Sequence, residues 1–82
     1  MVLDTDKIQD LNYQIRRIRL DIKNLERTIE TKRRNRFLDA GTEQALRQQI
    51  DARMGRIASM QAEIRRIENE AQRAQKLKEG LG

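Results

Sequence analysis

An unbroken heptad pattern of apolar residues constrains the first half of this chain more than any other feature. Apolar side chains recur there at alternating intervals of three and four residues, at Ile8, Leu11, Ile15, Ile18, Ile22, Leu25 and Ile29. This spacing keeps one face of an α-helix apolar and is typical of helices that pack as coiled coils. The chain contains no proline, a residue that kinks or breaks helices. The pattern therefore predicts one long amphipathic helix.

A second heptad series occupies the other half of the chain. It comprises Leu46, Ile50, Ile57, Met60, Ile64 and Ile67, and continues through Ala71 and Ala74. Arg53 stands at the one position of this series where an apolar residue is missing. The two series together form the predicted helix-helix seam, which fits an all-α fold.

The segment between the two series predicts a tight turn. Gly41 suits the left-handed residue that follows a helix, and Thr42 suits the N-cap of the next helix. We therefore expect a single helical-hairpin domain over residues 1–82. Its first helix would span about 5–39, its turn about 40–42 and its second helix about 43–79.

A turn this short makes the two helices antiparallel. If the chain folds about Gly41, facing residues have numbers that sum to 82, which pairs Ile22 with Met60 and Ile15 with Ile67. Each layer of the seam then pairs an a position of one helix with a d position of the other, as an antiparallel coiled coil requires. Two helices alone bury little surface, so we expect two copies to associate as a homodimer with a four-helix core.

Positive charge is concentrated near the predicted turn. The chain has 18 Lys and Arg against 13 Asp and Glu, a net charge of +5, and this balance suits an acidic partner such as nucleic acid. A basic tip is predicted to contact phosphates, with Phe37 stacking on a base. The alternative is that these cations solubilise the helix end and complement its dipole. The basic tip comprises Lys32, Arg33, Arg34, Arg36, Phe37, Arg53 and Arg56.

Small residues on the second predicted helix form another candidate surface. Gly55, Ala58 and Ala62 lie on its polar side, and glycine inside a helix costs about 1 kcal/mol relative to alanine. One interpretation is the close approach of a helix from a second chain. The other is an exposed face with no particular role.

Residue types that carry catalysis are scarce. The chain has no histidine and no cysteine, and a single serine, Ser59, so it offers neither nucleophile-base pairs nor soft metal ligands. We therefore expect no enzymatic activity, no cofactor, no metal and no small-molecule substrate. No apolar run approaches the roughly 20 residues of a membrane span, so we expect a cytoplasmic protein, or a virion-associated one if it is viral.

The two heptad series joined by a short turn resemble small helical-hairpin proteins of the Rop type, which dimerise into four-helix bundles and can bind RNA. They also resemble the hairpin arms that contact tRNA in some synthetases. The first hypothesis is a structural or adaptor protein that self-associates or docks on a partner protein, which would suit a phage or mobile element. The second is a hairpin that binds DNA or RNA through its basic tip.

Overall fold

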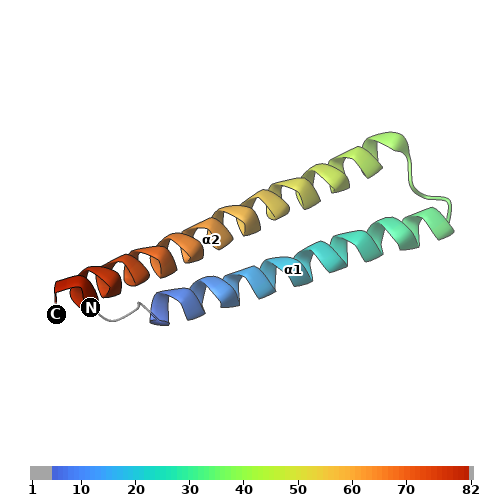
Figure 1. Ribbon diagram of the computed structural model, residues 1–82. Helices are drawn as coiled ribbons and strands as arrows, with labels where there is room; N and C mark the ends of the chain where they lie inside the picture. The colour runs from blue at the N-terminus through green and yellow to red at the C-terminus, as the bar shows by residue number, and fades with distance from the viewer. Residues whose placement is uncertain (1–4, 82) are drawn as a thin grey trace.

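The chain folds into two long helices that run antiparallel and lie side by side (Figure 1). The computed structural model describes residues 5–81, without the side chains of 78, 79 and 81. Helix α1 spans Thr5–Arg34 and helix α2 spans Ala40–Leu81. The hairpin is elongated, with extents of 68 × 18 × 13 Å. The predicted all-α hairpin is confirmed, and neither described helix has an apolar stretch that would let it cross a membrane.

The core is a thin seam between the two helices. Residues Leu25, Leu46, Met60 and Ile64 are partly buried and pack against it. No described side chain is fully buried, and even Ile15, the least exposed, keeps 4% of its surface accessible. The hairpin therefore leaves its apolar interior incompletely covered. The buried residues all belong to the two heptad series: Leu11, Ile15, Ile18, Ile22, Ile29, Ile50 and Ile57.

The first helix ends earlier than its predicted end near residue 39. Arg36 adopts a left-handed conformation with φ of 61°. The backbone N–H of Phe37 donates to the carbonyl of Lys32 at 2.9 Å, and that of Arg36 donates to Arg33 at 3.2 Å. These two bonds are the pair that defines a Schellman helix terminus. The left-handed turn is therefore at Arg36, and the prediction that Gly41 provides it is wrong, because no described glycine has a positive φ.

The second helix starts at Ala40, before its predicted start at about 43. Asp39 is its N-cap, and not Thr42 as predicted: the Asp39 carboxylate accepts the backbone N–H of Thr42 at 2.6 Å. This hydrogen bond is the main reason why the pKa of Asp39 lies below its usual value. Gly41 and Thr42 lie in the first turn of α2, and the connection occupies residues 35–39.

The earlier turn gives the helices a different register from the predicted one. Ion pairs join Arg33 to Glu43 at 3.0 Å and Arg53 to Asp21 at 3.9 Å, and the residue numbers of these pairs sum to 76 and 74. A third pair, Lys7 with Glu63 at 3.2 Å, sums to 70. All three lie below the predicted 82, and the two pairs nearest the turn bracket 75, one heptad less. The predicted register is therefore wrong.

A register near 75 keeps the same faces in the seam but changes the partners. It places Ile18 opposite Ile57 and Ile15 opposite Met60, and all four lie in or against the buried cluster. It also leaves the last turns of α2 without an α1 partner. Figure 1 shows the red end of α2 extending past the first turn of α1.

Candidate functional site

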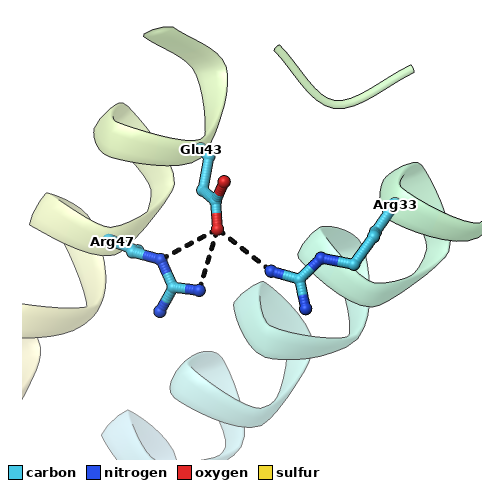
Figure 2. A network of polar contacts seen from close by, with 3 residues as sticks. All are labelled: Arg33, Glu43 and Arg47. Carbon is cyan, nitrogen blue, oxygen red and sulfur yellow. Dashed lines mark hydrogen bonds and ion pairs between the residues drawn. The ribbon is translucent and has the colours of Figure 1, made fainter. Parts of the chain in front are cut away.

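The end of the hairpin nearest the turn carries a three-residue charge network (Figure 2). Glu43 Oε1 accepts hydrogen bonds from Arg33 Nη2 at 3.0 Å and from Arg47 Nη2 and Nε at 2.9 and 3.1 Å. The bond from Arg47 is the largest cause of the lowered pKa of Glu43, and Arg33 adds to it. The Arg33 charge is thus shared with an acid on the opposite helix.

Two more of the predicted contact residues have acidic partners. Arg34 Nε lies 3.2 Å from Glu30 Oε1 on the same helix. Arg53 Nε lies 3.9 Å from Asp21 on the opposite helix, and its Nη1 donates to the carbonyl of Gln49 at 3.2 Å. Arg53 is half-buried in the seam, so its aliphatic stem packs there while its charged end reaches outward.

The structure divides the predicted basic tip into two groups. Arg53 and Arg56 lie 13 and 16 residues beyond Ala40, which is about 20 and 24 Å along α2 at 1.5 Å per residue. They are therefore not at the turn. The other five form one group, here called the turn cluster: Lys32, Arg33, Arg34, Arg36 and Phe37.

Part of the turn cluster is free to meet a partner. The Phe37 side chain is 75% exposed, and it borders a shallow depression lined also by Arg27, Lys32 and Asn35. Arg36 makes no ion pair with any residue that the structure describes, whereas the charge of Lys32 acts on the Asp39 carboxylate and helps to lower its pKa. The exposed ring and these two cations are the features of the turn that suit an anionic ligand.

The small residues of α2 lie on the outside of the hairpin. Gly55, Ala58 and Ala62 are all exposed. A Cβ atom added at Gly55 would meet no atom within 4 Å, so no contact within the described chain requires glycine there. The three residues do not form a site by themselves.

An apolar groove between the helices is the feature that sequence reasoning missed. Leu20 and Met54 are 60% and 50% exposed, and together with Ile22 and Ile57 they line it. Met54 follows Arg53, which occupies a seam position. A methionine flanking the seam is therefore the signal that was available in the sequence. Ile22 and Ile57 belong to the buried core, so the groove opens directly onto it.

The fold defines a class of protein, the elongated antiparallel helical hairpin, here with an exposed apolar groove. Among the described residues, no cluster of three or more carboxylates could hold a metal ion. Comparisons with protein-family models, with curated proteins and with solved structures found no match for the chain.

Proposed function

We propose that the chain is a non-enzymatic structural or adaptor protein that acts by packing one helical face against another protein surface, a second copy included. The observation that carries this proposal is the open groove. Leu20 and Met54 are at least half exposed, beside a seam in which no described side chain is fully buried. Covering apolar surface contributes about 25 cal/mol per Å², and exposed apolar surface that adjoins a core is typical of interaction sites.

The charge network supports this proposal over a purely electrostatic role. Arg33, Arg34 and Arg53 already interact with Glu43, Glu30 and Asp21. A phosphate would have to compete with these acids for the guanidinium groups. The apolar groove has no such internal competitor, and a second protein surface is its natural complement.

We expect the wild-type chain to sediment above its 9.7 kDa monomer mass at micromolar to millimolar concentration, with a Tm that rises with concentration. The double variant Leu20→Lys/Met54→Lys should return to the monomer mass, because both charges would enter the groove. Leu77→Lys, at a leucine that is 69% exposed and lies outside the groove, is the matched control and should associate as the wild type does. A wild-type monomer at 1 mM whose unfolding is independent of concentration would contradict self-association through this groove.

Nucleic-acid binding is the second candidate, and the turn cluster is the observation that favours it. Phe37 presents three quarters of its surface, and Arg36 makes no ion pair with a described residue. Stacking of a base on an aromatic ring contributes about 1–3 kcal/mol and tolerates any sequence. This arrangement suits a single strand, because its bases are free to stack.

A fluorescent single-stranded oligonucleotide tests this second candidate. Arg36→Ala should lower the log–log salt slope of binding by about 0.7, because one phosphate contact is lost. Phe37→Ala should weaken binding by about 1–3 kcal/mol and leave the salt slope unchanged. Arg73→Ala, on α2 at the other end of the hairpin, is the control that should change neither quantity. Failure of the wild type to bind at low salt would exclude this function.

A further inference from the structure

The apolar groove continues into a second groove toward the turn, and the two differ in charge. They share Glu26 and Met54. The groove farther from the turn is bordered by the cations Arg16, Arg19 and Lys23. The one nearer the turn is bordered by the acids Glu26, Glu30 and Asp51, along with Arg33 and Arg47, which share the single carboxylate of Glu43. One face of the hairpin is thus basic on one half and acidic on the other.

Most of these charges have no partner inside the hairpin. Arg16, Arg19 and Lys23 make no ion pair with a described residue, and neither do Glu26 and Asp51. Of the six, only Glu30 is engaged, by Arg34 at 3.2 Å. Opposite charges that are unpaired in one molecule and separated along its face are available to a complementary surface.

We propose that this face binds a second copy of the chain in antiparallel orientation, about a two-fold axis that crosses α1 near Lys23. This inference rests on the proposed function and specifies its partner and its geometry. Arg16 and Glu30 lie seven residues on either side of Lys23. Arg19 and Glu26 lie four and three residues from it. The two-fold axis therefore places Arg19 of each copy against Glu26 of the other, and Arg16 against Glu30.

The same operation brings apolar surface together. Leu20 lies three residues from Lys23 on α1, and Met54 lies within three residues of the α2 position opposite Lys23. Both are therefore near the axis. A patch that meets itself across a two-fold axis forms a closed dimer. Both copies of the patch are then covered, so no further chain can add to the dimer through it. A parallel arrangement would set the basic half of one copy beside the basic half of the other, which like charges oppose.

The overlap is large enough for a stable interface. Lys23 lies 14 residues from Phe37 at the turn, about 21 Å along the hairpin. Antiparallel copies therefore overlap over about 42 Å, and a hairpin 18 Å wide offers roughly 760 Å² per copy. Standard protein–protein interfaces bury about 800 Å² on each partner.

Charge reversal and rescue test the geometry by sedimentation equilibrium of the full chain. Arg19→Glu and Glu26→Arg should each raise the dimer dissociation constant at least about tenfold, because each creates two like-charge contacts across the axis. The double variant Arg19→Glu/Glu26→Arg should regain wild-type association. Arg56→Glu is the matched control and should dimerise as the wild type does, because Arg56 lies outside both grooves and makes no ion pair with a described residue.

A mixing experiment is specific to the two-fold arrangement. The Arg19→Glu chain and the Glu26→Arg chain should associate with each other more tightly than either does with itself, because both cross-axis contacts then join opposite charges. If both single variants dimerise like the wild type, or if the double variant stays weak, the antiparallel geometry is wrong. The proposed function would still stand in that case, provided that Leu20→Lys/Met54→Lys abolishes association. A wild-type chain that stays monomeric would overturn the dimer and leave only docking on a different protein.

Discussion

A chain with cysteines in place of Ile18 and Ile57 is expected to form an intramolecular disulfide under mild oxidation, whereas one with cysteines in place of Ile22 and Met60 is not. The register near 75 sets positions 18 and 57 in one layer of the seam. It separates positions 22 and 60 by about seven residues along the axis, or roughly 10 Å. A disulfide requires Cα atoms within about 7 Å, so the second pair cannot close without moving the backbone.

The stabilisation should be large where the disulfide forms. Closing a loop of about 40 residues contributes roughly 4 kcal/mol by restricting the unfolded chain. Urea unfolding of the same double-cysteine variant, oxidised and then reduced, measures this difference and cancels the packing cost of the substitutions. Work at low micromolar concentration keeps cross-links within one chain. Faster intramolecular closure of the 22–60 pair would show that the helices are paired in the register that sums to 82.

The register shows what a heptad pattern determines and what it leaves open. The pattern identified which faces meet, because a helix with apolar residues every 3.5 positions has only one apolar stripe. It did not determine how far one helix slides along the other. A slide of a whole heptad keeps the same faces in contact, so sums of 82 and 75 both satisfy the spacing. The two registers differ in the layers near the turn: a sum of 82 sets Lys32 against Ile50 and Arg53 against Ile29, whereas a sum of 75 pairs Leu25 with Ile50 and Ile29 with Leu46.

The turn was mispredicted because a helix cap at Asp39 competes with the left-handed preference of Gly41. Gly41 is the better left-handed residue by propensity, and placing Arg36 in that conformation costs about 1–2 kcal/mol. Asp39 is a strong helix cap, because its carboxylate accepts a hydrogen bond from the backbone N–H of Thr42. A cap at Asp39 leaves only residues 35–39 for the connection, and α1 then has to end at Arg34.

The charged surface was predictable in composition and not in pairing. The sequence shows that cations gather near the turn. It shows acid partners only along a helix, three or four residues away, as for Arg34 and Glu30. The contact of Arg33 with Glu43 joins residues ten apart across the turn, and that of Arg53 with Asp21 joins the two helices. Such pairs depend on the register, so an error in the register conceals them.

Replacement of Ile15 by alanine is expected to cost about 3 kcal/mol of unfolding free energy. Ile15 is 4% exposed and belongs to the buried cluster. Removing its outer methyl and methylene groups loses their burial and leaves a space that two stiff helices cannot close, and such changes cost about 2–5 kcal/mol. A domain of this size is stable by roughly 4–12 kcal/mol in total, so the loss should be plain in a urea titration.

Leu20→Ala is the matched control on the same helix, because Leu20 is 60% exposed. At low concentration, where the chain is a single hairpin, its cost should stay within about 0.5 kcal/mol. At high concentration its cost should grow, because the groove that Leu20 borders is then covered in the wild type and binding adds to stability. The cost of Ile15→Ala should be similar at both concentrations, since Ile15 is buried within the hairpin itself. Equal costs for the two variants at low concentration would mean that the seam is not the core.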